Sequence, residues 1–264
     1  MLQRPESVLD IYDMQREALR REAIILSVII PAYNEELYLA ACLEAALAEL
    51  AANAARGPFE IVVVDNGSTD RTAEIAGRFA DVRVVVERRK GLTRARQRGL
   101  QAARGGILAY VDADTLMPPG WIGRVLDTFD ADDEVVCVSG PYVYYDVRSI
   151  KAASIRLYWR LVAAPTYRLT KYMAVGGNFA ASAKALARIR GFDTTIPFYG
   201  EDTDIARRLA SIGRVVFDKD LVMPTSARRL HTEGFFMTGM RYMANFATEA
   251  AFGRPLTTRY RDIR

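Results

Sequence analysis

Two aspartates separated by one alanine are the clearest chemical feature of this sequence. Asp112 and Asp114 follow the apolar run 107–111, which is typical of a buried strand. Side chains i and i+2 of an extended segment point the same way, so both carboxylates can approach one ion. Carboxylate oxygens suit Mg²⁺ or Mn²⁺, which keep further coordination positions for water and phosphate oxygens. A solvated turn before Pro118 and Pro119 is the alternative, and at this stage both interpretations stay open.

A second acidic cluster opens a helix that the sequence predicts over residues 203–212. Glu201, Asp202 and Asp204 crowd this position, where the helix dipole partly stabilises negative charge. Asp202 is a candidate general base that would take a proton from a hydroxyl. An acidic capping turn without chemistry is the alternative.

Three further groups of polar residues are candidates for binding a ligand or a metal. Asp65 begins the turn 65–70, where it could accept hydrogen bonds from a nucleotide base or simply belong to a strand–turn–helix connection. Basic residues crowd positions 88–98, and a solvated helix face competes there with contact to a diphosphate. His231 is the single histidine, and a structural imidazole and a Mn²⁺ ligand both remain open.

Short apolar runs alternate with helix-like segments through the first half of the chain, and they are the elements that must position these residues. Strands are predicted at residues 27–31, 60–64, 82–86 and 107–111, and helices at residues 36–50, 70–80 and 92–103. This alternation predicts an α/β fold with a mostly parallel central sheet and helices on both faces. The carboxyl ends of parallel strands meet at one edge of the sheet, where ligands bind. The polar segments that follow the four strands, residues 32–36, 65–70, 87–91 and 112–114, are therefore expected to converge.

The second half of the chain has a less regular pattern. An aromatic strand is predicted at residues 139–147, helical segments at 152–172 and 184–190, and strands near 214–217 and 221–223. The last forty residues are rich in Arg, Phe and Met and receive no assignment.

The composition is that of a globular protein, with half of the residues hydrophobic and 26% charged. Lys and Arg exceed Asp and Glu by four (36 − 32), which fits phosphate-bearing ligands, an anionic membrane surface or plain surface charge. No apolar window approaches the roughly 18 residues of a membrane span, and residues 1–23 lack the apolar core of a signal peptide. Cys42 and Cys137 are expected to be buried, reduced thiols, so the sequence predicts a cytoplasmic protein.

Taken in order, these segments resemble the family 2 glycosyltransferases, which have the GT-A fold. The matching segments are SVIIPAYNEE (27–36), VVVDNGSTD (62–70), KGLTRARQRGLQAARGGILAYVDAD (90–114), GGNFAASAKAL (176–186) and GFDTTIPFYGEDTDIARRL (191–209). The resemblance implies a Rossmann-like, mostly parallel sheet, a nucleotide-sugar donor and Mg²⁺ or Mn²⁺ as cofactor. Two departures concern the donor site: Asn66 stands where the family often has a second aspartate, and Gln97 where it often has asparagine.

The resemblance also implies roles for individual residues. Those implied to contact the donor are Pro31, Ala32, Tyr33, Glu35, Asp65, Lys90, Arg96, Asp112, Gly177 and Asn178. Asp65 would bind the base, commonly uracil, and Lys90 and Arg96 would lie near the ribose or the diphosphate. Asp114 would bind the metal directly, with Asp112 beside it and His231 as a third ligand. Asp202 would be the catalytic base, with Glu201 next to it at the sugar or acceptor.

Four parts of the chain follow from this resemblance. They are an N-terminal helical extension (1–26), a nucleotide-sugar-binding half (27–115), an acceptor-binding and catalytic half (116–225) and a C-terminal segment (226–264). The implied reaction is the metal-assisted transfer of a hexosyl group from a nucleoside-diphosphate sugar to an acceptor hydroxyl by one displacement, which inverts the anomeric configuration. A retaining transferase of the same fold remains an alternative.

Other classes of protein account less well for the sequence. A nucleotidyltransferase needs a basic, Gly-rich loop after the first strand, and a nicotinamide enzyme needs GxGxxG there, whereas residues 32–36 are acidic. A scaffold that binds a nucleotide sugar without turnover would not need the intact Asp112, Asp114 and Asp202. The dispersed arginines do not fit a nucleic-acid binder.

The acceptor is the least determined partner. Residues 152–172 and 234–247 mix basic residues with Trp, Tyr, Phe and Met, as an interfacial helix would. Peripheral membrane contact at the cytoplasmic face, with a lipid-linked acceptor, therefore stays open beside a core-facing helix. A glycan or a small molecule is also open as the acceptor, and the sequence does not determine the sugar or the oligomeric state.

Overall fold

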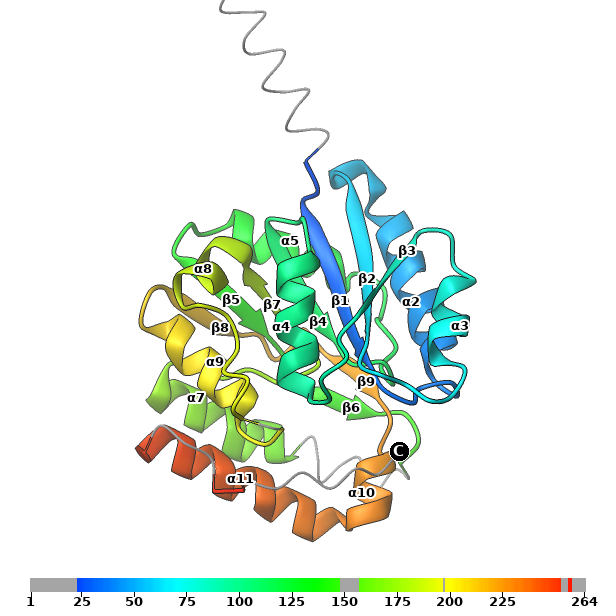
Figure 1. Cartoon of the computed structure of the whole chain (residues 1–264). Helices are drawn as coiled ribbons and strands as arrows, with labels where there is room; N and C mark the ends of the chain where they lie inside the picture. Colours follow the sequence, from blue (N-terminus) through cyan, green and yellow to red (C-terminus); the bar gives the residue numbers. More distant parts are fainter. Residues whose placement is uncertain (1–22, 148–156, 197, 253–255, 258–264) are drawn as a thin grey trace, which may run out of the picture.

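The computed structural model describes residues 23–147, 157–196, 198–252 and 256–257. A seven-stranded sheet forms its centre, with the strand order β3-β2-β1-β4-β7-β5-β8 (Figure 1). The strands are β1 (Leu26–Ala32), β2 (Phe59–Asp65), β3 (Val82–Val86), β4 (Ile107–Val111), β5 (Val135–Ser139), β7 (Asn178–Ser182) and β8 (Arg214–Phe217). The four predicted strands of the first half are all present and parallel to one another, so the predicted mostly parallel sheet is confirmed.

One strand runs against the others. β7 is antiparallel to both of its neighbours, β4 and β5, while β5 and β8 are parallel. The residues that precede β7 therefore reach the sheet edge at which β4 ends, and the register pairs Val111 with Asn178. This reversal brings Gly177 next to Asp112, which alternation of strands and helices alone does not predict.

Helices cover both faces of the sheet, as predicted. Those described are α2 (Leu39–Ala52), α3 (Thr72–Gly77), α4 (Leu92–Ala102), α5 (Trp121–Asp130), α7 (Ala164–Thr170), α8 (Ala183–Arg188), α9 (Glu201–Ala210), α10 (Arg228–Glu233) and α11 (Phe235–Phe252), with short helical turns η1 (Ala54–Arg56) and η2 (Trp159–Ala163). One buried cluster joins the sheet to α2 and α5, and a second joins the other face to α4, α8 and α9.

The burial of β1 shows why the sheet forms. All seven residues of this strand are buried, with Val28 and Ile30 in the first cluster and Ile29 in the second. Alternate side chains of a strand point to opposite faces, so a continuous β-branched run fills both cores at once. The apolar runs of the sequence thus belong to a sheet sandwiched between two layers of helices.

A small second sheet lies beyond the carboxyl edge. β6 (Tyr142–Tyr144) pairs in parallel with β9 (Met223–Thr225). The single strand predicted over 139–147 is instead the end of β5 and the separate β6, which are divided at Gly140 and Pro141. Proline lacks a backbone N–H and so interrupts a hydrogen-bonded ladder.

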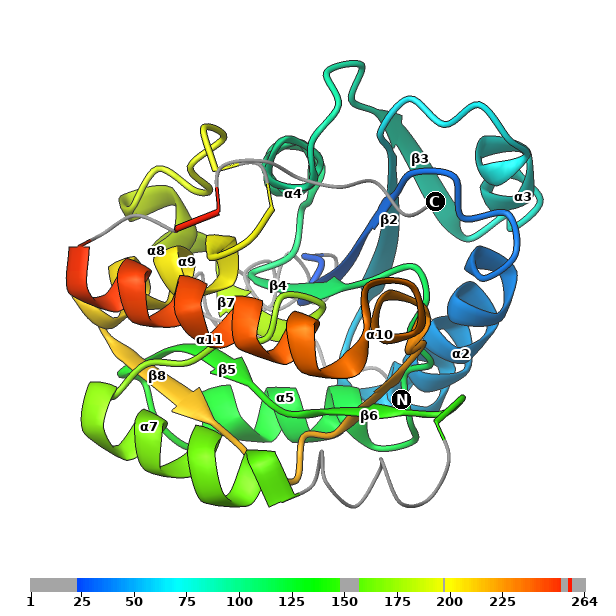
Figure 2. The ribbon, with the colours of Figure 1, turned by 90° about the horizontal axis from the view of Figure 1, so that it is seen from below.

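The last part of the chain forms helices beneath the sheet. α10 and α11 follow β9 and lie across the underside of the molecule, where Figure 2 shows them in the foreground. Among the described residues, every helix is too short or too polar to cross a membrane. The predicted N-terminal helix falls almost wholly on residues 1–22, and the predicted helix at 152–172 falls partly on residues 148–156, both outside the described residues.

Candidate functional site

The turns after β1 and β2 meet at the carboxyl edge of the sheet. The backbone N–H of Asn34 donates to the hydroxyl of Ser68 at 3.1 Å, and that of Glu36 donates to the carboxylate of Asp70 at 3.1 Å. The N–H of Glu35 donates to Thr72 at 2.7 Å. These bonds place the AYNEE and DNGSTD segments side by side, as the parallel sheet predicted.

Asn66 holds the third segment against the first two. Its amide donates to the carbonyl oxygens of Glu87 and Arg89, both at 2.9 Å, and accepts from the N–H of Gly91 at 2.8 Å. A carboxylate could not donate either of the first two bonds. The departure from the family pattern at this position therefore has a structural reason, because the neutral amide fixes the basic loop 87–91.

The residues predicted to bind the nucleoside lie in this corner. Pro31 and Ala32 are buried at the end of β1, and Asp65 is buried at the end of β2, where it accepts from the N–H of Ser68 at 3.1 Å. Lys90 donates to the hydroxyl of Tyr33 at 2.5 Å, and its ammonium lies 4.2 Å from the centre of the ring. A basic and an aromatic side chain thus stand together at the edge where a nucleotide is expected.

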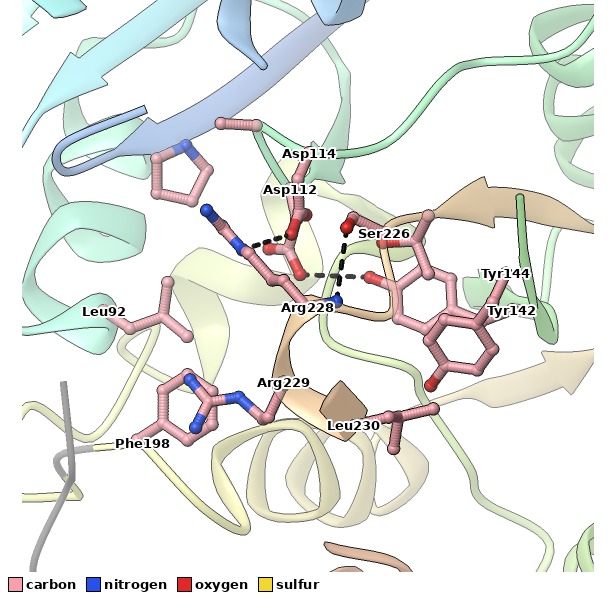
Figure 3. Close-up of a pocket in the computed structure, with 13 residues that line it drawn as sticks. Leu92, Asp112, Asp114, Tyr142, Tyr144, Phe198, Ser226, Arg228, Arg229 and Leu230 are labelled. Atoms are coloured by element: carbon pink, nitrogen blue, oxygen red, sulfur yellow. Dashed lines mark hydrogen bonds and ion pairs between the residues drawn. The ribbon is translucent and has the colours of Figure 1, made fainter. Parts of the chain in front are cut away.

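Asp112 and Asp114 follow β4 and line a pocket with Tyr142 and Arg228 (Figure 3). Asp112 accepts from Arg96 and from the hydroxyl of Tyr142, each at 3.1 Å. Asp114 forms an ion pair with the Nε of Arg228 at 2.8 Å. The two carboxylates therefore face one space but are held by different cations.

Arg96 is the buried link between distant parts of the chain. Its side chain is only 1% exposed, so a solvated helix face does not account for it. The guanidinium pairs with Asp112 on one side and with Glu201 on the other. The second half of the chain is thereby tied to the predicted metal-binding motif by two charge-assisted contacts.

Glu201 and Asp202 begin α9 and have raised pKa values for related reasons. Removal from water raises the pKa of Glu201, and the neighbouring Asp202 and Asp112 raise it further, against the opposing effect of Arg96. Burial also raises the pKa of Asp202, again opposed by Arg96. Asp202 takes part in no ion pair among the described residues and accepts from the N–H of Thr203 at 2.8 Å. A half-buried carboxylate with a raised pKa and no ion-pair partner of this kind suits proton transfer.

Two glycines before β7 leave the space that this cluster needs. A Cβ on Gly177 would collide with the carboxylate of Asp112 and the hydroxyl of Tyr142. A Cβ on Gly176 would lie 2.9 Å from the carboxylate of Glu201 and 3.0 Å from Arg96. Only a residue without a side chain allows the backbone to pass so close to three charged groups.

Asn178, which was predicted to border the sugar, is fully buried within the protein. Its side-chain Oδ1 accepts from the indole of Trp121 at 2.9 Å, and its side-chain Nδ2 donates to the backbone oxygens of Pro141 and Leu221. The side chain joins α5, β7 and the two loops that lead to β6 and β9. These hydrogen bonds hold together the segments that form the pocket wall, while the Asn178 side chain itself stays inside the protein.

Arg228 is a residue of this site that the sequence did not indicate. It lies at the start of α10 and makes bidentate contacts of 2.7 and 2.5 Å with Glu35 besides its contact with Asp114. These two carboxylates, together with hydrogen bonding to Glu35, raise the pKa of Arg228 well above its usual value, against the effect of burial. The guanidinium therefore stands as a fixed cation between the predicted nucleoside pocket and the predicted metal ligand.

The residues present fit a divalent cation through two carboxylates. Asp112 and Asp114 offer hard oxygen donors on the pocket wall, which suits Mg²⁺ or Mn²⁺. His231 is exposed on α10, and within the described part of the chain no three His, Cys, Asp or Glu side chains gather closely enough to form a metal site. The participation of His231 thus stays a prediction.

Tyr142 and Asp146 are further residues that sequence reasoning passed over. Asp146 accepts from the hydroxyl of Ser226 at 2.8 Å and from the N–H of Ala227 at 2.7 Å, which fixes the start of α10. The N–H of Ser226 also donates to the backbone oxygen of Asp114 at 3.1 Å. The aromatic run at 142–145 marked a strand, but no local pattern tied it to residues eighty positions away.

Comparison with known proteins agrees with this arrangement. The family model described as glycosyl transferase family 2 matches residues 27–190, more than half of the chain. Glycosyltransferase AglE of Haloferax volcanii is 35% identical over 108 residues, which are 39% of this chain and 34% of that protein. An undecaprenyl-phosphate 4-deoxy-4-formamido-L-arabinose transferase of Pectobacterium carotovorum is 37% identical over 108 residues, 39% of this chain and 32% of that protein. The matched segments thus span about a third of these relatives.

Solved structures share the fold at low identity. Mannosyltransferase PcManGT of Pyrobaculum calidifontis, in complex with GDP-Man and Mn²⁺, has a TM-score of 0.67 at 21% identity over 92% of this chain and 71% of that chain. Glucosyl-3-phosphoglycerate synthase of Mycobacterium tuberculosis, in complex with Mn²⁺, UDP and glucosyl-3-phosphoglycerate, has a TM-score of 0.61 at 20% identity over 97% and 88% of the two chains. The GT-A-like fold predicted from the sequence is confirmed, and by the extent of the family match the chain belongs to glycosyl transferase family 2.

Proposed function

We propose that this protein is a glycosyltransferase that moves a hexosyl group from a nucleoside-diphosphate sugar, with UDP-sugars favoured, to an acceptor hydroxyl with inversion. The observation that carries the proposal is the contact of Arg96 with both Asp112 and Glu201. This contact brings the predicted metal-binding motif beside the predicted catalytic base, Asp202. Donor and acceptor chemistry can then occur in one place.

The proposed reaction is a single displacement at the anomeric carbon. The acceptor oxygen forms a bond to that carbon while the bond from carbon to the diphosphate oxygen breaks and its electron pair leaves with the diphosphate. Asp202 takes the proton of the hydroxyl. Because attack and departure occur on opposite faces of the sugar, the configuration inverts. Glu201, held by Arg96, would orient the sugar or the acceptor beside this base.

The donor is proposed to lie along the carboxyl edge of the sheet. Asp65, Tyr33 and Lys90 surround the corner where β1, β2 and the loop 87–91 meet. The two structural neighbours described above contain GDP-Man or UDP, which supports a nucleoside diphosphate as the carrier. The preference for uracil follows from the family resemblance at Asp65.

Asp114 and Asp112, with His231 as the proposed third ligand, would hold Mg²⁺ or Mn²⁺. A bound cation of this kind would offset the negative charge of the departing diphosphate. The presence of Mn²⁺ in both structural neighbours supports this cofactor. Arg228 already supplies positive charge beside Asp114 and would have to share that carboxylate or release it.

The division into a donor half at 27–115 and an acceptor half at 116–225 is part of the same proposal. Its support is that the Tyr33, Asp65 and Lys90 corner is built from the first half, whereas Asp202 comes from the second. A cytoplasmic location is also proposed, and its support is that Cys42 and Cys137 are both buried and form no disulfide.

Thermal unfolding with a panel of UDP-, GDP-, dTDP- and CMP-sugars, each with Mn²⁺ and with chelator, tests the donor. A ligand at a hundredfold its dissociation constant adds about 2.7 kcal/mol to the free energy of unfolding. We expect UDP-sugars to raise the melting temperature with Mn²⁺ and not with chelator. Folded protein that responds to no nucleotide sugar would contradict the proposal. A response without turnover on any acceptor would favour a protein that only binds nucleotide sugars.

A further inference from the structure

A helical segment on the underside of the molecule exposes apolar side chains that nothing in the described structure covers. Residues 157–170 are helical throughout, passing from Leu157 through η2 into α7. The exposed large hydrophobic side chains of this segment are Leu157 (55%), Tyr158 (38%), Leu161 (61%), Val162 (41%) and Leu169 (86%). They are five of the eleven such side chains among the described residues, so apolar exposure is concentrated here. We name residues 157–171 the exposed helix.

Uncompensated positive charge accompanies this apolar surface. Arg160, Arg168 and Lys171 are exposed, and the exposed helix contains no acidic residue. No ion pair joins these three cations to any other described residue, although many other arginines of the chain are paired. A surface that combines exposed apolar side chains with these cations is complementary to a lipid bilayer, which has an apolar interior and, where its lipids are anionic, a negatively charged surface.

The helix α11 also exposes apolar side chains. Met237 (57%) and Met240 (47%) are exposed near its start, and Figures 1 and 2 place α7 and α11 on the same underside of the molecule. Tyr172, just after the exposed helix, lies with its ring centre 6.5 Å from that of Phe246 in α11. The two helices thus lie on the same side of the molecule.

The exposed helix begins beside the candidate active site. The indole of Trp159 donates to the backbone oxygen of Tyr142 at 3.0 Å, and Tyr142 in turn donates to Asp112. Tyr142 lines the pocket, so the start of the exposed helix is one hydrogen bond away from the pocket wall. A molecule held against the exposed helix is therefore near the pocket.

We propose that the exposed helix and the start of α11 dock on the surface of an anionic lipid bilayer, so that an acceptor carried by the bilayer reaches the pocket. The leucines would enter the boundary between head groups and acyl chains to a depth of roughly 5–10 Å. Arg160, Arg168 and Lys171 would meet the phosphate groups of the lipids. The delivery of an acceptor rests on the proposed function, whereas the docking itself does not.

A protein partner explains the surface less well. Protein interfaces have aromatic and apolar centres surrounded by paired polar groups. Three cations that pair with no described residue would need an equally acidic partner. A second copy of this chain could not supply that partner through its own exposed helix, because that helix carries three basic residues and no acidic one. The bilayer satisfies both the apolar and the charged part of the surface.

Vesicle flotation tests the docking directly. We expect the full chain to float with vesicles of phosphatidylglycerol and phosphatidylcholine and not with vesicles of phosphatidylcholine alone. The double variant L161E/L169E should lose partitioning by about tenfold or more, because both side chains leave the bilayer. The double variant R168A/K171A should lose about fivefold for each cation removed. Binding by the unaltered protein should weaken as salt rises.

The matched control is Ala51→Glu, an exposed position in the last turn of α2, which Figure 1 shows at the opposite end of the molecule from α7 and α11. It adds a carboxylate away from the proposed surface and should bind vesicles as the unaltered protein does. Stabilisation by a nucleotide sugar, measured in each variant, reports folding and donor binding separately from docking. If the unaltered protein binds a nucleotide sugar but no vesicles, the docking proposal is wrong and the proposed function stands. If it binds vesicles but no nucleotide sugar, the proposed function is wrong and the docking proposal stands.

Two other outcomes would overturn the docking. One is equal flotation of L161E/L169E and the unaltered protein, which would mean that another surface binds the lipid. The other is a dimer in sedimentation equilibrium that L161E/L169E dissociates while the unaltered protein leaves vesicles unbound, which would assign the surface to a second copy of the chain.

Discussion

Asp202 and Glu201 are adjacent carboxylates that differ in their partners. Burial raises the pKa of both, but Glu201 is held by Arg96, whereas Asp202 accepts only from Thr203 among the hydrogen bonds described. Its contact with Arg96 fixes the Glu201 carboxylate in place, so Glu201 is suited to positioning. A carboxylate with a raised pKa and no opposite charge in contact can take up and release a proton at a moderate cost.

Replacement of this base gives the first prediction. Asp202→Asn should lower kcat by roughly 10²–10⁴-fold and leave nucleotide-sugar binding nearly unchanged, because the amide cannot accept the proton. In the unaltered enzyme, turnover should rise with pH through the raised pKa of Asp202, since only the charged form acts as base. Steady-state kinetics over a range of pH measure both effects.

Asp133→Asn, at an exposed position in the turn that follows α5, is the matched control and should retain full turnover. Unchanged kcat in Asp202→Asn, with a pH profile like that of the unaltered enzyme, would remove Asp202 from the proposed mechanism.

Arg228 gives the second prediction at this scale. Its removal should free Asp114 for a cation, so Arg228→Ala should bind Mn²⁺ more tightly in a titration followed by electron paramagnetic resonance. The same change leaves the buried Glu35 without its bidentate partner, so the protein without metal should lose about 3–5 kcal/mol of its free energy of unfolding. Taken together, Arg228→Ala should melt at a lower temperature than the unaltered protein without metal, and Mn²⁺ should raise its melting temperature by more than it raises that of the unaltered protein.

Arg71→Ala is the control, because Arg71 pairs with the neighbouring Glu36 at an exposed position and makes no contact with Asp114. Weaker Mn²⁺ binding in Arg228→Ala would show that the guanidinium assists the metal site instead of competing with it.

At the scale of elements, the direction of β7 decides the shape of the site. Because β7 is antiparallel to β4 and β5, the loop that precedes it lies at the carboxyl edge of the sheet. If β7 were parallel, the loop that follows it would lie there instead. Gly177 reaches Asp112 for this reason. The β6–β9 pair acts in the same way, since it places the start of α10, and with it Arg228, against the turn that carries Asp114.

The third prediction tests the close contact between Gly177 and Asp112. Gly177→Ala should cost about 1–3 kcal/mol in stability, because the added methyl group must displace the carboxylate of Asp112 or the hydroxyl of Tyr142. Metal and donor binding should weaken with it. Chemical denaturation and Mn²⁺ titration measure the two losses. Gly77→Ala, where an added Cβ meets nothing within 4 Å, should be neutral or slightly stabilising.

Equal stability of the two alanine variants, with unchanged Mn²⁺ binding in Gly177→Ala, would mean that the loop before β7 moves away without consequence for the site.

At the scale of the whole molecule, Arg96 joins the two halves of the chain through a buried charge network. Arg96→Met should cost about 3–5 kcal/mol, because Asp112 and Glu201 lose the cation between them. Without Arg96, the pKa of Glu201 in the folded variant rises further above its value in the unfolded chain. The variant should therefore be most stable below that unfolded value and lose stability as pH rises through the raised folded pKa.

Denaturation of the variant at several pH values measures this slope. Arg96→Met with Glu201→Gln should regain part of the stability at high pH, since the double change removes the uncompensated carboxylate. Arg98→Met, on the same helix but in no ion pair with a described residue, is the control and should stay close to the unaltered protein. A loss in Arg96→Met that does not depend on pH would show that packing, and not charge, is what Arg96 contributes.

The sequence by itself determined the sheet of the first half, the family and the segments that meet at the binding edge. These features depend on local patterns, since a β-branched run, a helical period and a short polar turn each report their own conformation. The reversed β7, the separate β6 and the position of Arg228 were decided by the tertiary structure. They depend on contacts between residues far apart in the chain, such as Arg228 with Glu35 and Ser226 with Asp146, and no local pattern records which distant partner completes a charge or a hydrogen bond.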